Sequence, residues 1–522
     1  MDNNTLQILI AMVIYMAAVI GIGLVYAKRA NKNSEEYYLG GRSLGPWITA
    51  MSAEASDMSG WLLMGLPGVA YWCGLADAFW TAFGLAVGTY LNWLIVSKRL
   101  RRYSVRTNAI TLPEFFSNRF RENKKTIMMI AAAFILIFFT VYASSCFVTC
   151  GKLFSTLFGT KYVSMMILGA VFVLIYTLLG GFLAESASDF MQSIVMIVAL
   201  VVIVTVGTLS AGGLGQVMEN ASQIPGFMEF FGLAAPAVDA EGVQQVVNGV
   251  PQFGEAADYG LLTVCSMMAW GLGYFGMPQV LLRFMAIRKE EELTRSRRIA
   301  MVWVCISLAV AVFIGIVGRQ LFPTAHLTKG AAENIFITLA TSSLPPLLAG
   351  FVMAGILAAT ISSSDSYLLI AASAFAKNIY QGICKKDATD KQVMWVSRIT
   401  LLVLALVGVV IALDENSVIF QIVSFAWAGF GATFGPLMLF SLFWKRVNKP
   451  GAIAGMVGGA GMVFLWKLVI SGFGGVFAIY ELLPAFLFSS VCIVVVSLLT
   501  KAPSKEIEAD FEAVRSKNVV DA

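Results

Sequence analysis

The sequence predicts an all-α polytopic membrane protein. Hydrophobic residues make up 58% of the 522 residues, and charged residues only 13%, whereas soluble domains carry roughly 25% charged residues. Mean hydropathy is +0.79. Apolar runs recur at nearly even intervals from residue 6 to residue 500 with no soluble-looking block between them. We therefore expect a single transmembrane domain over residues 1–500 and a short tail at 501–522.

Runs of about twenty apolar residues, long enough to cross a hydrocarbon core of roughly 30 Å, occur about thirteen times. The first run is longer than the apolar core of a signal peptide and has no basic segment before it, so it is read as a span. The expected spans lie near residues 6–26, 44–71, 74–96, 126–150, 162–180, 189–210, 259–286, 299–321, 345–375, 395–413, 417–443, 450–471 and 477–500.

Charges in the loops predict the orientation, because cytoplasmic loops are enriched in Lys and Arg. The loop 97–125 holds nine Lys and Arg residues, whereas the loop 211–258 holds none and carries six acidic residues. Asp2 precedes the first run, and Lys28 and Lys32 follow it. We expect an outer amino terminus, a cytoplasmic carboxyl terminus, and location in the inner or plasma membrane.

The seven cysteines lie mostly in apolar runs and are expected to be small packing residues.

The second span contains polar residues that no lipid-facing helix would tolerate. Glu54 and Asp57 are three residues apart and share one helix face, and Ser52, Ser56 and Ser59 lie beside them. This face must point at protein or water. A polar packing seam between helices is the alternative interpretation.

The seventh span is predicted to be interrupted. Three glycines between residues 271 and 276 weaken the helix, and Pro278 removes the hydrogen bond that the carbonyl of Tyr274 would accept. Trp270 and Tyr274 are four residues apart and project from one face, as a pair that could stack on a compact solute would. A simple proline kink with two packed aromatic residues is the alternative.

The ninth span contains a group of uncharged oxygen atoms that could bind a cation. Ala359, Ser362 and Ser363 lie on one helical face, so a carbonyl and two hydroxyls can converge. Neutral oxygens favour a monovalent hard cation, because a divalent one would require several carboxylates. Hydroxyls that bond back to preceding carbonyls are the alternative.

Interrupted helices at corresponding positions of two halves indicate a transporter built from inverted repeats. The second and seventh spans are each the first of five consecutive spans. We therefore expect a first repeat at about 44–210 and a second at about 259–443, with accessory spans at about 6–26, 450–471 and 477–500.

Four sequence motifs carry a resemblance over nearly the whole chain. They are LGGRSLG at 39–45, ASDMSGWLLMGLPG at 55–68, GGFLA at 180–184, and WGLGYFG at 270–276 with Pro278 after it. Together they resemble the solute:sodium symporter family, in particular its proline-transporting branch. The resemblance implies a LeuT-like fold with a core of five plus five inverted-repeat helices.

The resemblance also implies site residues. A sodium ion would be held by the backbone carbonyls of Ala55, Met58 and Ala359 and the hydroxyls of Ser362 and Ser363, with Asp57 nearby. Substrate contacts would fall on Trp61, Tyr142, Trp270, Tyr274 and Pro278. The coupling and ion-release path would include Arg42, Ser59, Gly60 and Asp189.

The function that follows is sodium-coupled uptake of L-proline by alternating access, without catalysis and without a cofactor. The expected partners are sodium, L-proline or a similar small solute, and the lipid bilayer; no nucleic acid and no obligate protein partner are expected. Glu54 and Asp365 depart from the family pattern and leave ion stoichiometry and a proton role open. Another solute, such as pantothenate or betaine, is the main alternative, and a channel or a membrane sensor is less favoured.

Overall fold

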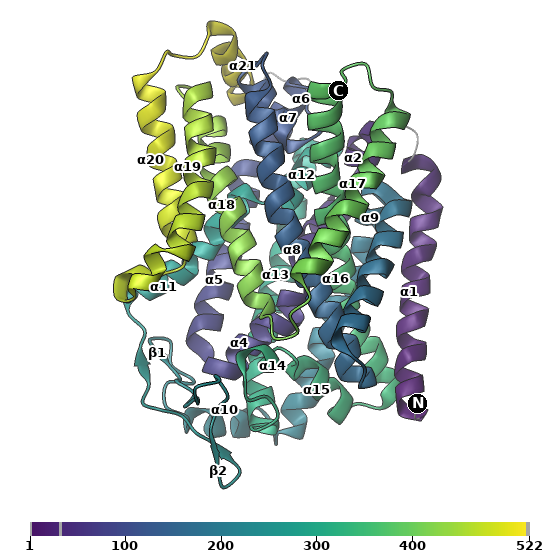
Figure 1. Cartoon of the computed structure of the whole chain (residues 1–522), viewed down its shortest axis with the longest axis vertical. Helices are drawn as coiled ribbons and strands as arrows, with labels where there is room; N and C mark the ends of the chain where they lie inside the picture. The colour runs from purple at the N-terminus through teal and green to yellow at the C-terminus, as the bar shows by residue number, and fades with distance from the viewer. Residues whose placement is uncertain (1–2, 31–33, 518–522) are drawn as a thin grey trace.

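Apolar helices make up most of the structure, a computed structural model that describes residues 3–30 and 34–517 (Figure 1). The chain starts with α1 (Asn3–Ala30), α2 (Ser34–Leu39) and η1 (Gly40–Arg42). The segments up to residue 210 are α3 (Pro46–Asp57), η2 (Trp61–Gly65), α4 (Leu66–Cys73), α5 (Leu75–Leu91), η3 (Asn92–Val96), α6 (Ser97–Arg106), α7 (Leu112–Arg119), α8 (Thr126–Phe158) and α9 (Tyr162–Ser210).

A loop region with α10 (Leu214–Ser222) and four two-residue strands follows. β1 (Gly232–Leu233) pairs antiparallel with β4 (Ala257–Asp258), and β2 (Val246–Val247) pairs antiparallel with β3 (Val250–Pro251).

The remaining segments begin with a second broken helix. They are α11 (Leu261–Met268), η4 (Ala269–Gly276), α12 (Pro278–Ala286), η5 (Glu290–Glu292), α13 (Leu293–Leu321), α14 (Lys329–Ala332), α15 (Ile335–Ser343), α16 (Pro346–Ser373), η6 (Ala374–Cys384), α17 (Asp390–Ile411), α18 (Ile419–Phe443), α19 (Lys449–Leu468), η7 (Ile470–Phe473), η8 (Gly475–Ala478), α20 (Leu482–Leu499) and α21 (Lys505–Arg515).

The predicted class, an all-α polytopic membrane protein, is confirmed. Within the described residues, ten helices are long and apolar enough to cross a membrane, and the pair Leu261–Gly276 and Pro278–Ala286 would make an eleventh. The expected spans 44–71 and 162–180 coincide with the shorter apolar helices Trp61–Cys73 and Tyr162–Leu178. These two fall below the length needed because their spans are broken, so the count of thirteen stays a prediction.

The first break lies where polar residues interrupt the second expected span. α3 ends at Asp57, and Met58 takes the non-helical values φ −83° and ψ 76° before the chain turns back into helix at η2. Ser and Asp side chains weaken a helix here because they compete for backbone hydrogen bonds. Gly60 permits close packing, since a Cβ there would lie 2.3 Å from Thr149 Oγ1 on α8.

The second break confirms the expected interruption of the seventh span. Residues 269–276 form the tighter η4, Met277 is extended, and α12 begins at Pro278 with a bend of 43°. Proline fits the first turn of a helix because the backbone N–H that it lacks has no partner there.

α9 consists of two helices that meet at Gly181, where φ is +61° and ψ is −178°. The helices Tyr162–Leu178 and Gly181–Ser210 correspond to the separate spans expected at 162–180 and 189–210. Glycine reaches this conformation without steric cost. The second part therefore starts at Gly181, eight residues before the expected boundary, and Asp189 lies inside a helix.

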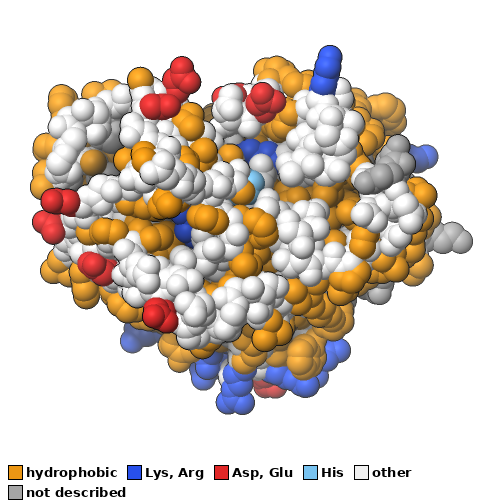
Figure 2. All heavy atoms as spheres, turned by 90° about the horizontal axis from the view of Figure 1, so that it is seen from below, with side chains coloured by type: hydrophobic (Ala, Val, Ile, Leu, Met, Phe, Trp, Pro, Cys, Tyr) orange, Lys and Arg blue, Asp and Glu red, His pale blue; other side chains and the backbone are white. Residues whose placement is uncertain are grey.

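The basic and acidic loops lie at opposite ends of the molecule, as predicted: α6 and α7 at one end, and α10 with the strands at the other (Figure 1). Figure 2 shows the end with the strands, where most acidic side chains lie along the left and upper edges; the single histidine and a few basic side chains are recessed among apolar ones, and other basic side chains project at the edges. Which end faces the cytoplasm stays a prediction. Asp2 and Lys32, used to orient the first span, lie outside the described residues.

Within the described part of the predicted tail, residues 501–517, the helix α21 (Lys505–Arg515) is docked on the rest of the protein. Asp510 on α21 lies 3.1 Å from Arg106 Nε and 2.8 Å from Arg121 Nη2, and Arg102 Nη1 donates to the carbonyl of Val514 at 2.5 Å. Phe511 is buried and lies under the guanidinium of Arg99. α21 therefore braces the basic loop between α5 and α8.

Replacing Asp510 with Asn should loosen this brace. Both guanidinium partners are nearly half exposed, so we expect a loss of only about 1 kcal/mol, which would raise the open fraction of α21 about fivefold. Limited trypsin digestion of the purified protein, followed at Lys505 and Arg515, measures this rate. Glu512→Gln, which alters an exposed pair with Arg515, is the matched control; equal rates in both variants would contradict the assignment.

His326 lies between α13 and α14 at the end with the strands. Its Nε2 is 2.8 Å from Thr338 Oγ1, and its ring meets the edge of Tyr71 at 5.8 Å. Burial lowers the pKa of His326 from 6.5 to about 4. The folded protein therefore holds this imidazole neutral at pH values where the unfolded chain binds a proton.

Stability should consequently fall as pH drops from 7 towards 4. Between the unfolded pKa of 6.5 and the folded pKa of about 4, the unfolded state binds more protons, so the free energy of unfolding decreases with decreasing pH. The melting temperature of the wild type, measured from pH 7 to pH 5, should fall more steeply than that of His326→Gln. Parallel slopes would rule out His326 as the source.

Candidate ion and solute site

The break after α3 brings oxygen atoms from two distant helices together. Ser362 Oγ donates to the carbonyl of Ala55 at 2.8 Å and lies 3.2 Å from the carbonyl of Ala359, and Ser363 Oγ donates to the same Ala55 carbonyl at 3.2 Å. All four residues are completely buried. Four of the five expected sodium ligands thus meet where α3 stops against α16.

Met58, the fifth expected ligand, caps the end of α3. Its N–H donates to the carbonyl of Glu54 at 2.8 Å, and its backbone then leaves the helix. A carbonyl at this position is no longer committed to the helical ladder, because the last carbonyls of a helix have no partner within it. The Met58 carbonyl is therefore available to a ligand three residues after Ala55.

The donor set suits a monovalent hard cation. The converging atoms are carbonyl and hydroxyl oxygens, and each hydroxyl can rotate its hydrogen away and offer lone pairs instead. Within residues 3–30 and 34–517, no group of three or more His, Cys, Asp or Glu side chains is arranged to hold a metal ion. A divalent cation would need several such charged ligands.

Asp57 connects the two broken helices. Its Oδ2 accepts the Tyr274 hydroxyl at 2.7 Å, and its Oδ1 accepts Gln279 Nε2 at 3.3 Å. The backbone carbonyl of Asp57 accepts Trp61 Nε1 at 3.2 Å and the Tyr142 hydroxyl at 3.5 Å. One residue beside the expected sodium ligands therefore holds three of the five side chains expected to contact the solute.

The expected solute residues form part of a ring of aromatic side chains. The ring centroids of Trp61 and Trp270 are 6.3 Å apart, and Tyr142 is joined to the same cluster through Asp57. Pro278 lies at the start of α12 and borders a separate small cavity with Tyr38. The structure thus gathers Trp61, Tyr142, Trp270 and Tyr274, and places Pro278 to one side.

Sequence reasoning missed several members of this cluster. Trp427 Nε1 donates to the carbonyl of Trp270 at 2.8 Å, Tyr480 stacks on Trp270 at 5.0 Å, and Tyr367 stacks on Tyr142 at 4.1 Å. Aromatic residues in apolar spans look like ordinary packing, so no signal set these three apart. Gln279 could have been found, because it is a polar residue directly after the helix-breaking proline.

Of the remaining expected residues, Arg42 lies towards the α6 and α7 end. Arg42 donates to Ser104 Oγ at 3.0 Å, to the carbonyl of Ala109 at 2.6 Å and to the carbonyl of Met285 at 2.8 Å. It thereby ties the approach to α3, the basic loop and the end of α12 together. Ser59 and Gly60 lie in the unwound stretch itself.

Asp189 belongs to a different, fully buried cluster. Its Oδ2 accepts Ser52 Oγ at 2.7 Å and Arg283 Nη2 at 3.2 Å, and Arg283 also pairs with Glu185. Arg42 and Asp189 are not brought together, although both hold α12. Arg283 and Glu185 were missed because both occur close to expected span boundaries, where charged residues are common.

Glu54 and Asp365 are both buried. Glu54 Oε1 accepts Trp93 Nε1 at 3.2 Å, and Asp365 Oδ1 accepts the N–H of Ser366 at 2.8 Å. Glu54 directly precedes the expected ligand Ala55, and Asp365 lies two residues after the expected ligand Ser363. Neither contacts the Ser362 hydroxyl in the hydrogen bonds of the described residues.

A profile of the sodium:solute symporter family matches residues 37–459. The chain belongs to this family. The family consists of transporters, so the chain is a multi-span membrane transporter and not an enzyme.

Full-length relatives of known name are similar to this chain. It is 41% identical to a sodium/proline symporter of Haemophilus influenzae over 97% of each chain, and 39% identical to one of Escherichia coli over 96% of this chain and 95% of the relative. A third sodium/proline symporter, from Staphylococcus aureus, is 38% identical over 98% and 96%.

The fold matches that of a solved family of sodium symporters. A substrate-bound, outward-open Na⁺-coupled sialic acid symporter superposes with a TM-score of 0.73 at 18% identity, over 96% of this chain and 99% of that one. The LeuT-like fold expected from the sequence is therefore confirmed.

Replacing Tyr274 with Phe in this symporter should weaken sodium-dependent solute binding about tenfold or more. The change leaves Asp57 Oδ2 without its hydroxyl donor in a buried place, which costs about 1–3 kcal/mol. Equilibrium binding of the transported solute as a function of sodium concentration measures the effect.

Tyr71→Phe is the matched control for this experiment. It also removes a tyrosine hydroxyl, which donates to the carbonyl of Phe322 at 2.6 Å far from Asp57. Sodium-dependent binding that falls equally in both variants would show a general loss of stability and would contradict a specific role for the Tyr274 hydroxyl.

Proposed function

We propose that this chain is a sodium-coupled L-proline symporter that works by alternating access. The observation that carries the proposal is the shared break in the second span: Ala55 and Met58 offer carbonyls to the ion, and Asp57 and Trp61 face the solute cluster on the same short segment. The relatives named above support L-proline as the solute.

Sodium acts on the unwound segment between α3 and η2. When sodium binds, the Ala55 carbonyl coordinates the ion in place of its hydrogen bonds from Ser362 and Ser363. The ion then holds the end of α3 against these two serines. The carbonyl of Asp57, two residues further on, is then held in place for the groups around the solute. Binding of the ion and of the solute are linked because each orders the same backbone.

The solute part of the site fits a small imino acid. Trp61, Trp270 and Tyr274 offer ring faces to an apolar ring, and the freed backbone groups and the Tyr142 hydroxyl offer polar contacts to its charged ends. Membrane potential contributes about 2.3 kcal/mol per charge per 100 mV, so one sodium ion per cycle supports a concentration ratio of roughly 50 before its own gradient is added.

Release takes place at the end that carries α6 and α7. In this proposal the amino terminus is outside, the carboxyl terminus is cytoplasmic, and the two repeats span about 44–210 and 259–443 in the inner or plasma membrane. Arg42 closes the inner end by joining η1, the basic loop and α12, and Asp189 with Ser52 lies on the ion's way out from Ser362. Opening requires these contacts to separate.

Sodium-driven uptake of radiolabelled L-proline into proteoliposomes tests the proposal. With an inward sodium gradient the wild type should accumulate proline, whereas potassium or proton gradients should not drive it. Asp57→Ala should abolish accumulation, and Ser362→Ala should raise the sodium concentration for half-maximal uptake at least tenfold.

Ser364→Ala is the control for Ser362→Ala, because the Ser364 hydroxyl donates back to the Thr360 carbonyl at 2.6 Å and not to an expected sodium ligand. Sodium-driven uptake of betaine or pantothenate in place of proline would overturn the solute and keep the mechanism. Uptake that does not saturate would indicate a channel and overturn both.

A further inference from the structure

The end of η4 is held by a polar side chain from another helix. Pro278 has no N–H for the carbonyl of Tyr274, which lies four residues earlier and would accept one in a continuous helix. Asn92 Nδ2 donates to this carbonyl at 3.0 Å instead, and both residues are buried. The N–H of Met277 lies 3.5 Å from the same oxygen, beyond the usual range of about 2.7–3.2 Å. Asn92 therefore supplies the hydrogen bond that the break in the seventh span removes.

Asn92 lies on a widened turn that follows α5. In η3 the N–H of Ser97 donates to the carbonyl of Asn92, five residues earlier, and the Ser97 hydroxyl donates at 2.6 Å to the carbonyl of Trp93, four residues earlier. The serine thus satisfies two carbonyls where its N–H alone would satisfy one. Such π-helical turns are rare and are frequent at functional sites. Hydrogen bonds of the chain itself therefore stabilise the widened turn.

The turn η3 contacts both broken helices. Trp93 Nε1 donates to Glu54 Oε1 on α3 at 3.2 Å, and its ring meets the ring of Phe284 on α12 at 4.5 Å. The neighbouring Asn92 bonds to Tyr274 on η4. Two adjacent residues of one short turn thus hold α3 on one side of the site and η4 with α12 on the other.

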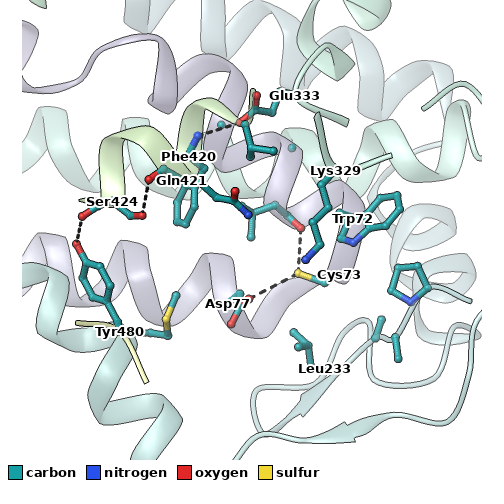
Figure 3. A pocket seen from close by; sticks show the side chains of 18 of the residues that line it. Trp72, Cys73, Asp77, Leu233, Lys329, Glu333, Phe420, Gln421, Ser424 and Tyr480 are labelled. Atoms are coloured by element: carbon teal, nitrogen blue, oxygen red, sulfur yellow. Dashed lines mark hydrogen bonds between the residues drawn. The ribbon is translucent and has the colours of Figure 1, made fainter. Parts of the chain in front are cut away.

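The start of η4 is held by a different helix. Trp427 Nε1 on α18 donates to the carbonyl of Trp270 at 2.8 Å, and the ring of Tyr480 stacks on that of Trp270 at 5.0 Å. Figure 3 shows that Tyr480 is itself fixed on α18, by the bond from its hydroxyl to the carbonyl of Ser424 at 2.7 Å. α18 thus fixes the start of η4, whereas Asn92 holds the carbonyl at its end.

Tyr274 connects this contact to Asp57. Its ring meets the ring of Trp427 edge-on at 5.0 Å, and its hydroxyl donates to Asp57 Oδ2 at 2.7 Å. Only two side-chain torsions join the ring of a tyrosine to its backbone. A shift of the Tyr274 carbonyl therefore displaces the hydroxyl that Asp57 accepts.

We propose that Asn92 is a positioning residue for the binding of sodium and solute. By holding the Tyr274 carbonyl, it keeps the Tyr274 hydroxyl on Asp57, beside the expected sodium ligands. Stability alone does not explain the amide, because its Oδ1 is buried and has no hydrogen-bond partner in the described part of the chain, which offsets the contribution of the Nδ2 bond. This role rests on the proposed function, since it concerns the same site.

Sodium-dependent binding of radiolabelled L-proline to the purified protein in lipid nanodiscs tests this role. Asn92→Leu, which keeps the branching of the side chain but cannot donate, should weaken binding about tenfold, because a buried carbonyl loses its donor. In a Tyr274→Phe background the same change should weaken binding less than about threefold, since the hydroxyl that Asn92 positions is already gone. Asn92→Ala gives the same comparison if leucine does not fit. Unchanged binding, or a tenfold loss in both backgrounds, would overturn the proposal.

Two further variants separate the donor from general packing. Asn378 on η6 is also buried, donates one side-chain bond, to Thr111 Oγ1 at 2.8 Å, and has an Oδ1 without a partner among the described residues. Asn378→Leu should therefore keep the affinity within about twofold of the wild type. Asn92→Asp should recover most of the affinity, because an unpaired buried carboxyl takes up a proton and can then donate. An aspartate variant as weak as the leucine variant would contradict the proposal.

Hydrogen exchange without solute distinguishes this proposal from the proposed function. Backbone amides of residues 269–277 should exchange about threefold faster or more in Asn92→Leu than in the wild type, and at the wild-type rate in Asn378→Leu. Equal rates in all three proteins would overturn the positioning role whether or not L-proline binds. Faster exchange in Asn92→Leu, with no sodium-dependent binding of L-proline by the wild type, would support the positioning role and overturn the proposed solute.

Discussion

A helix that ends inside the membrane needs other hydrogen-bond donors for its last carbonyls, because the hydrocarbon region holds no water to donate to them. In this symporter those partners come from other helices: Ser362 and Ser363 reach the carbonyl of Ala55, and Trp61 and Tyr142 reach that of Asp57. In an uninterrupted helix these carbonyls would instead accept hydrogen bonds from backbone N–H groups of the same helix. The groups proposed to hold the ion and the solute are thus available because α3 ends at Asp57.

The second broken helix is bound to the first through the same residue. Asp57 receives Tyr274 from η4 and Gln279 from α12, one on each side of Met277. η4 in turn lies directly on α5, where a Cβ on Gly88 would come within 2.2 Å of the carbonyl oxygen of Gly271. Such backbone contact leaves little room for sliding, so α5 and η4 form one unit. Because Asp57 contacts both η4 and α12, we expect a movement at the end of α3 to displace both broken helices.

The sequence predicted the membrane class, the two breaks and the polar face of α16 because each violates what lipid tolerates. Proline, clustered glycine and buried carboxylates are visible without an alignment. Trp427, Tyr480 and Tyr367 were not predictable, since an aromatic residue in an apolar span satisfies every local rule whether it packs or binds. The docking of α21 was also not predictable, because its ion pairs with Arg106 and Arg121 join residues 404 and 389 positions apart in the sequence. The expected span 162–180 ends one residue before Gly181, but hydropathy did not show that the next helix begins at this bend and not at residue 189.

The indole side chains at the centre of this symporter also give it an optical property. Of the eleven tryptophans in the chain, Trp61, Trp270 and Trp427 form a continuous group, with ring centroids 6.3 Å and 5.9 Å apart. All three are essentially inaccessible to water. Indole emission responds to nearby charge and polarity, and excitation passes easily between rings this close. The protein therefore contains intrinsic fluorophores among the residues proposed to bind the solute, and we expect its tryptophan fluorescence to change when ion and solute bind, without an added label.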